Sequence, residues 1–124
     1  CRNTAALVCP EQKIMIDARL NEINLGSWDG KSFDHIRKSH PELFRQRGEQ
    51  IVRFRPPRGE SFNDLKTRVI PFFEALKQPF DSPVLVVTHS GVIRVMLCHY
   101  LGMELTKLLE TKPAYGQLLL LGKS

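Results

Sequence analysis

The sequence lacks any apolar run that approaches the ~20 residues needed to cross a membrane. It also lacks a basic segment followed by an apolar stretch at its start, so no signal peptide is visible. Its only cysteines are Cys1, Cys9 and Cys98, and they form no C-x-x-C pair. This argues against a disulfide framework and a zinc knuckle. We therefore expect no membrane contact, no metal and a location in the reducing cytoplasm.

The composition is that of a small globular protein. The 124 residues are 42% hydrophobic and 25% charged, which argues against wholesale disorder. This length suits one domain and is too short for two. We therefore expect residues 1–124 to form a single domain.

The net charge of +5 is concentrated in one segment, because five arginines lie between residues 45 and 58 against Glu49 alone. Such a segment suits nucleic acid, an acidic membrane surface or a phosphorylated small molecule, or it is simply a solvated basic loop. Phe54 is the single aromatic residue within it, which is little for base stacking. We expect a phosphorylated small molecule as the partner, rather than nucleic acid or a membrane.

Hydrophobic periodicity predicts helices that alternate with strands. Apolar residues recur at helical spacing over 61–77, and Ser61 with Asp64 forms a weak capping box before them. Further helices are expected over residues 2–8, 32–48 and 92–101. Residues 84–88 and 117–122 are apolar runs typical of buried strands, and 13–17 alternates like a shorter strand. The predicted class is α/β, with three layers and helices on both faces of a mostly parallel sheet.

The turn after the predicted strand 84–88 is the clearest candidate site. His89 follows the strand, and Ser90 and Gly91 open the next helix. Ligands of open α/β sheets bind beyond the carboxyl ends of strands, and N–H groups at a helix start favour anions. An imidazole there can carry charge near pH 7. The alternative is a strand-end histidine satisfied by a backbone carbonyl.

Two acidic residues are candidates by their context. Glu22 lies in the glycine-flanked loop 19–30, after the first predicted strand, and Glu60 immediately precedes a helix. The simpler explanations are a solvated loop carboxylate for Glu22 and a favourable helix-dipole contact for Glu60. His35 and His40 are five residues apart and share no helix face, so we assign no metal site.

Three segments, taken in order, resemble the histidine phosphatase superfamily, also called the phosphoglycerate mutase-like family. They are R-L-N-E-I-N-L-G-S-W-D-G (19–30), P-P-R-G-E-S-F (56–62) and V-V-T-H-S-G-V-I-R (86–94). The resemblance covers nearly the whole chain. It implies a phosphoglycerate mutase-like fold and a reaction that needs no cofactor and passes through a phosphohistidine.

The resemblance also implies roles for single residues. Glu22 takes the acid/base role, and His89 is the second histidine at the phosphoryl group. Glu60 is expected to orient arginines of the pocket. The residues expected to bind phosphate or substrate are Ser90, Gly91, Arg55 and Arg58.

The sequence departs from the family in one respect. The family's nucleophilic histidine lies in an R-H-G motif, and no R-H-G occurs here. The opening R-N-T-A-A-L resembles the tail of another family motif, so we expect the first strand to lie upstream of Cys1. The chain is then the C-terminal part of a phosphatase, incomplete at its N-terminus and inactive alone. The alternative is a non-catalytic phosphate-binding module. The sequence leaves open whether the protein is a monomer or a homodimer.

Two motifs bear on the substrate. The F-x-P-P-x-G-E-S pattern of residues 54–61 resembles α-ribazole phosphatases of cobalamin synthesis. L-N-E-I, residues 20–23, resembles the bisphosphatase that acts on fructose 2,6-bisphosphate. We prefer α-ribazole 5′-phosphate, with another small-substrate phosphatase or a mutase of the family as the alternative.

Overall fold

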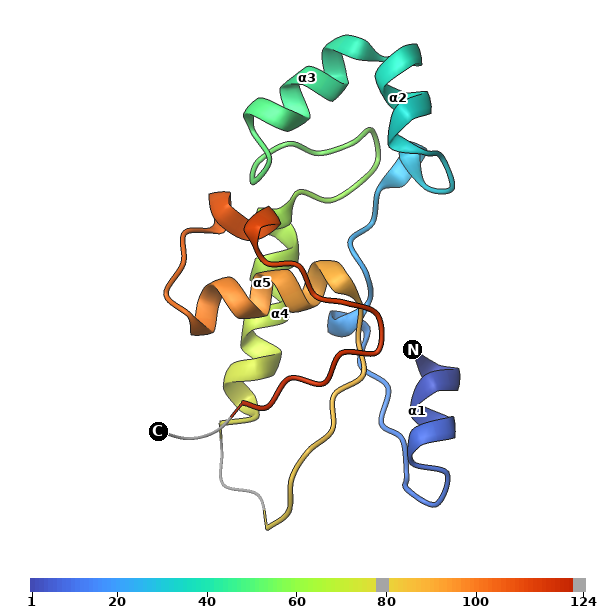
Figure 1. Ribbon diagram of the computed structural model, residues 1–124, viewed down its shortest axis with the longest axis vertical. Coiled ribbons are helices and arrows are strands. Elements are labelled where there is room, and N and C mark those ends of the chain that lie inside the picture. The colour runs from blue at the N-terminus through green and yellow to red at the C-terminus, as the bar shows by residue number, and fades with distance from the viewer. Residues whose placement is uncertain (78–80, 122–124) are drawn as a thin grey trace.

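The computed structural model describes residues 1–77 and 81–121 (Figure 1). Its α-helices are α1 (Arg2–Val8), α2 (Phe33–Ser39), α3 (Pro41–Glu49), α4 (Phe62–Ala75) and α5 (Ser90–Tyr100). Short 3₁₀ turns are η1 (Ala18–Leu20), η2 (Gly26–Trp28) and η3 (Leu105–Glu110). The predictions of a helix over 2–8 and of helical structure over 32–48 are confirmed, the latter as two short helices. No described helix is both long and apolar enough to traverse a bilayer.

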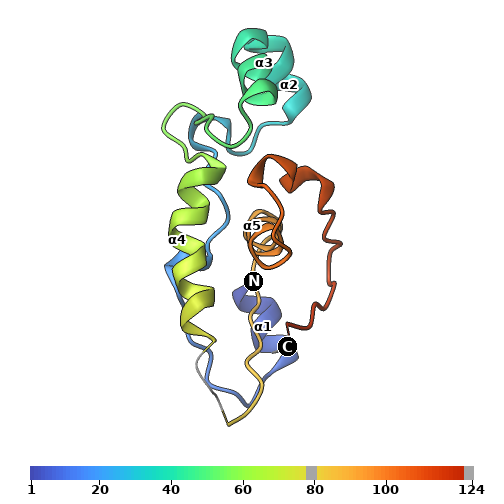
Figure 2. The ribbon, with the colours of Figure 1, turned by 90° about the vertical axis from the view of Figure 1, so that its left-hand side faces the viewer.

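The core lies between α4 and α5, which pack together in both views (Figures 1 and 2). Its buried side chains are Leu65, Val69 and Phe73 from α4, and Val92, Val95 and Met96 from α5. The predicted capping box begins α4: the hydroxyl oxygen of Ser61 accepts from the N–H of Asp64, whose carboxylate accepts from the N–H of Ser61. The predicted amphipathic helix at 61–77 is therefore confirmed.

The predicted three-layer α/β/α fold is wrong, because the residues that the structure describes contain no strand and no sheet. Segments 13–17, 84–88 and 117–121 are irregular, and no backbone hydrogen bond joins one of them to another. Residue 122, the last of the third predicted strand, lies outside the described residues. In Figure 2 the three segments run as separate, irregular traces.

The reason is that a strand needs a partner. A strand is held by backbone hydrogen bonds to an adjacent strand about 4.8 Å away. An apolar sequence pattern predicts that a segment is buried, but it does not specify an adjacent strand. The predicted burial on both faces fails as well, because Val84 and Leu85 are 50% and 49% exposed and Leu120 is 89% exposed. Val86 does pack against the α4–α5 core.

Gly26 and Gly59 let the loop at 19–30 pack closely against the turn at 56–60, since a Cβ on Gly59 would lie 2.7 Å from the carbonyl oxygen of Asn24. A Cβ on Gly26, whose φ is +55°, would lie 2.2 Å from the carbonyl oxygen of Pro57, so the close approach requires glycine. The N–H of Ser27 donates to that same carbonyl at 2.9 Å. Beside them Trp28 is 2% exposed, and its ring lies 5.3 Å from that of Phe54. This close packing fixes the loop against the start of α4.

Candidate functional site

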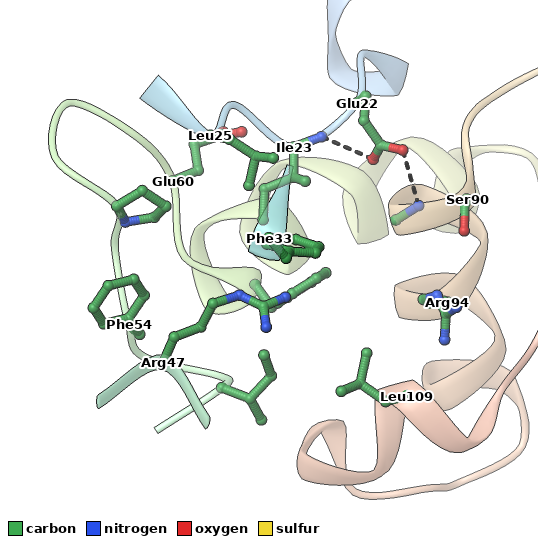
Figure 3. Close-up of a pocket in the computed structure, with 14 residues that line it drawn as sticks. Glu22, Ile23, Leu25, Phe33, Arg47, Phe54, Glu60, Ser90, Arg94 and Leu109 are labelled. Carbon is green, nitrogen blue, oxygen red and sulfur yellow. Dashed lines mark hydrogen bonds between the residues drawn. The ribbon is translucent and has the colours of Figure 1, made fainter. Parts of the chain in front are cut away.

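Glu22 reaches from the loop to the start of α5. One carboxylate oxygen accepts from the N–H of Ile23 at 2.9 Å, and the other accepts from the N–H of Gly91 at 3.2 Å (Figure 3). A Cβ on Gly91 would lie 2.3 Å from the Glu22 carboxylate, so this contact requires glycine. Two residues that are 69 positions apart in the sequence are thereby brought into direct contact.

His89 is the N-cap residue of α5 and directly precedes its first helical residue, Ser90. Its backbone is extended, with φ −106° and ψ 162°, and its side chain is partly buried. The preceding residue, Thr88, donates its hydroxyl to the carbonyl of Leu20 at 2.8 Å, which ties this turn to the Glu22 loop. The structure therefore places Glu22 beside the His89–Gly91 turn.

Glu60 braces the loop that carries Glu22. Its carboxylate forms a bidentate ion pair with Arg68, at 2.8 Å to Nε and 2.9 Å to Nη2. It also accepts from the N–H of Asn24 at 2.9 Å, while its own N–H donates to the Asn24 carbonyl at 2.7 Å. The Arg68 guanidinium lowers the pKa of Glu60. Sequence reasoning missed Arg68, whose loop partners lie 46 to 49 residues away.

The structure does not bring Arg55 and Arg58 to Glu22. Arg55 forms a bidentate ion pair with Asp64, with Nε and Nη2 each 2.6 Å from a carboxylate oxygen. This pair links the segment before α4 to that helix. This pairing holds the pKa of Asp64 well below its usual range. Arg58, with φ +63°, donates to the Ser27 hydroxyl at 3.1 Å. Neither arginine lines the cavity beside Glu22.

A cavity of about 210 Å³ opens beside Glu22, with Ser90 and Gly91 on its wall. Its other walls are mainly apolar, from Ile23, Leu25, Phe33, Ile51, Phe54, Pro56, Phe62 and Leu109. Two further arginines, both missed by sequence reasoning, also line it (Figure 3). Arg47 stacks at 4.6 Å from the Phe33 ring centre, and burial lowers its pKa. Arg94 donates to the carbonyls of Leu108 and Thr111.

The basic segment 45–58 is partly neutralised by ion pairs. Arg45 pairs with Glu42 and Glu49, and Arg55 pairs with Asp64. Arg47 instead faces the cavity. The one signal that could have singled out Arg47 is its position, because it alone of these arginines lies on the half-buried face of α3.

The chemistry open to this arrangement is proton transfer next to an anion. The Glu22 carboxylate and the positive end of α5 meet beside a mainly apolar cavity, and His89, the N-cap of that helix, does not itself line the cavity. A phosphoryl group would be favoured at the helix start, and the carboxyl group could give or take a proton there. Among the described residues, no three His, Cys, Asp or Glu side chains gather in a way that could hold a metal.

Comparisons with known proteins agree on one family. Residues 1–122 match the sequence pattern of the histidine phosphatase superfamily (branch 1). A 6-phosphofructo-2-kinase/fructose-2,6-bisphosphatase from Arabidopsis thaliana is 33% identical over 89 residues, which are 72% of this chain and 12% of that protein. The structure of YhfR from Bacillus stearothermophilus is 31% identical, with a TM-score of 0.76, over 93% of this chain and 58% of that one.

The α-ribazole phosphatase from Shigella flexneri shares the fold, with a TM-score of 0.77 at 23% identity over 88% of this chain and 55% of that one. The chain therefore spans little more than half the length of these solved structures. The superfamily pattern, by contrast, covers nearly all of the chain. This protein belongs to the histidine phosphatase superfamily.

Proposed function

We propose that the complete protein is a phosphomonoesterase in which Glu22 protonates the oxygen of the leaving alcohol. The observation that carries this proposal is the Glu22 carboxylate at the start of α5, 3.2 Å from the N–H of Gly91 and beside the His89 turn. A carboxyl group beside a bound phosphoryl group can protonate the departing oxygen. General acid catalysis of this kind contributes about 10²–10⁴-fold to the rate.

In this proposal the phosphoryl group binds next to His89 at the N-terminus of α5. The helix dipole and the N–H groups of the first turn favour an anion there, and the His89 side chain can add positive charge. The N–H of Gly91 is taken by Glu22, so we assign the amide of Ser90 to the phosphate. Phosphoryl transfer relies mainly on such positioning and charge neutralisation.

The attacking group is a histidine of the R-H-G motif, which this sequence does not contain. Its ring nitrogen bonds to phosphorus while the bond from phosphorus to the alcohol oxygen breaks and Glu22 protonates that oxygen. A water molecule then gives its proton to Glu22 and attacks the phosphohistidine, which releases inorganic phosphate. The 124-residue chain alone should therefore show no turnover.

The substrate that we propose is α-ribazole 5′-phosphate, on the basis of the F-x-P-P-x-G-E-S segment. The cavity beside Glu22 supports this choice because the alcohol part of that substrate carries an aromatic ring. The cavity has Phe33 and Phe54 in its walls and a volume of about 210 Å³. An apolar cavity of about 150 Å³ already admits benzene.

A sugar bisphosphate is the second candidate, and Arg47 is the observation that favours it. Its guanidinium reaches into the cavity, where a second phosphate on the leaving group could pair with it (Figure 3). The Arabidopsis relative is a fructose-2,6-bisphosphatase by name. The ratio of kcat/KM on α-ribazole 5′-phosphate and fructose 2,6-bisphosphate decides between the two.

Turnover by the complete protein tests the proposal. We expect His89→Ala to lower kcat/KM on p-nitrophenyl phosphate and on an alkyl phosphate alike, by about 100-fold or more, because His89 stabilises the phosphoryl group whatever leaves. His35→Ala, on the exposed face of α2, is the matched control and should change neither rate. Absence of turnover in the complete protein, or turnover that survives His89→Ala unchanged, would contradict the proposed function.

A further inference from the structure

We infer that Arg68 is the positioning residue that places the Glu22 carboxylate, an inference that rests on the function proposed above. Arg68 lies on α4, and all five N–H groups of its guanidinium have acceptors. Two go to the Glu60 carboxylate at 2.8 and 2.9 Å. The other three go to backbone carbonyls of the Glu22 loop: Arg19 at 2.7 Å, Asn21 at 2.9 Å and Glu22 itself at 3.2 Å.

The loop needs this support because residues 21–25 have no regular secondary structure of their own. Their backbone groups must find partners elsewhere. Arg68 supplies donors for the carbonyls on one side, and Glu60 engages both the N–H and the carbonyl of Asn24 on the other. The Arg68–Glu60 pair therefore defines the shape of the loop around Glu22.

Arg68 also links that loop to the rigid part of the molecule. Its near neighbours on α4, Leu65 and Val69, are fully buried in the core that α4 shares with α5. Glu22 is thus held at both ends: its carbonyl by Arg68 of α4, and its carboxylate by the N–H of Gly91 in α5. The packing of the two helices sets the distance between these two anchors.

The same contacts argue that Arg68 does not bind the phosphate. An arginine next to Glu22 in a phosphatase suggests such a role, and Arg68 does border an open hollow together with Glu22 and Glu60. However, each of its N–H groups already has a protein acceptor, and Glu60 compensates its charge. No donor is left over for a substrate oxygen.

A lysine cannot replace this arrangement. The planar guanidinium presents five donors in a fixed fork, whereas an ammonium group has three donors at a single point. Arg68→Lys therefore keeps the charge and the ion pair with Glu60 but loses most of the contacts with the loop carbonyls. The Glu22 carboxylate should then sample positions away from the departing oxygen.

The test compares an alkyl phosphate, whose leaving oxygen needs a proton, with p-nitrophenyl phosphate, whose leaving oxygen does not. In the complete protein, Arg68→Lys should lower the ratio of kcat/KM on these two substrates by about 10- to 100-fold, as misplacement of a catalytic group does. In a Glu22→Gln background the same exchange should leave the ratio unchanged. Arg45→Lys, the same exchange in an exposed ion pair of α3, is the control and should leave it unchanged in both backgrounds.

Amide hydrogen exchange in the complete protein gives a second readout that needs no activity. Arg68→Lys should speed exchange at Ile23, Asn24 and Gly91 by about 10-fold or more, while the amides of Val95 and Met96 in the core keep their rates. A uniform change across all of these amides would show a merely structural role and overturn the inference.

The outcomes separate the inference from the proposed function. The inference is overturned if Arg68→Lys slows the reaction of both substrates equally or changes neither rate. It is also overturned if Arg68→Lys lowers the ratio of kcat/KM by the same factor in the Glu22→Gln background. If Glu22→Gln itself slows both substrates equally, the proposed role of Glu22 fails, and the inference fails with it.

Discussion

At the scale of single residues, the site depends on how closely Glu22 approaches Gly91. A side chain at position 91 would place its Cβ 2.3 Å from the carboxylate, so Gly91→Ala must displace Glu22. We expect kcat/KM of the complete protein on an alkyl phosphate to fall by about 100-fold, with a much smaller loss on p-nitrophenyl phosphate.

Gly48→Ala is the matched control for this substitution. Gly48 lies in α3, and a Cβ there would meet nothing within 4 Å. Alanine should therefore stabilise the fold by about 0.5–1 kcal/mol and leave both rates unchanged. If Gly91→Ala instead keeps the full rate on alkyl phosphates, the contact between Gly91 and Glu22 has no part in catalysis.

The sequence indicates only those site residues whose role follows from local context. Glu22 stands out by its glycine-flanked loop, and His89 by its position before a helix. Arg68 gives no such signal, because its role depends on carbonyls 46 to 49 residues away. For Arg55 and Arg58 the local signal was misleading. Their basic surroundings predicted phosphate binding, but Arg55 pairs with Asp64 and Arg58 donates to Ser27.

At the scale of elements, the start of α4 supports the site because Glu60 directly precedes its N-cap. Ser61 is 2% exposed, and its hydroxyl oxygen accepts from the N–H of Asp64 at 3.1 Å. Ser61→Ala should lower the free energy of unfolding by about 1 kcal/mol, measured by urea denaturation of the 124-residue chain. An unchanged urea midpoint would show that the cap contributes nothing.

The ion pair between Arg55 and Asp64 should make this region sensitive to acid. Arg55 and the N–H of Ser61 hold the pKa of Asp64 below its ordinary value, 3.8. A carboxyl group whose pKa is lower in the folded state stabilises the fold above its unfolded pKa, and this contribution is lost as the pH falls. The difference in unfolding free energy between the wild type and Asp64→Asn should therefore shrink from about pH 5 to pH 2. A constant difference would contradict this pairing.

Helices and strands were not equally predictable in this chain. The helices follow from local signals: Ser61 and Asp64 cap α4, and Pro41 separates α2 from α3. The strands depend on a neighbour that no local pattern specifies. Segments 84–88 and 117–121 accordingly have the expected apolar runs, but among the described residues no backbone hydrogen bond joins either of them to another extended segment.

At the scale of the whole molecule, distant segments build one site around the packed pair α4 and α5. The loop at 19–30 supplies Glu22, the start of α5 supplies Ser90 and Gly91, and α2 and α3 contribute Phe33 and Arg47 to the cavity. The order of the three motifs sufficed to predict the superfamily. The cavity walls could not be predicted, because they come from segments that meet only in three dimensions.

The most direct test of Glu22 as the general acid is the dependence of kcat/KM on the basicity of the leaving group. The complete protein and its Glu22→Gln variant would be measured on a series of phosphomonoesters from p-nitrophenyl to alkyl. Glu22→Gln should lose about 10²–10⁴-fold on the alkyl esters and little on p-nitrophenyl phosphate, so that its rates fall more steeply as the leaving alcohol becomes more basic. Parallel dependences for the two proteins, with the same loss on every ester, would contradict a role for Glu22 in protonating the leaving group.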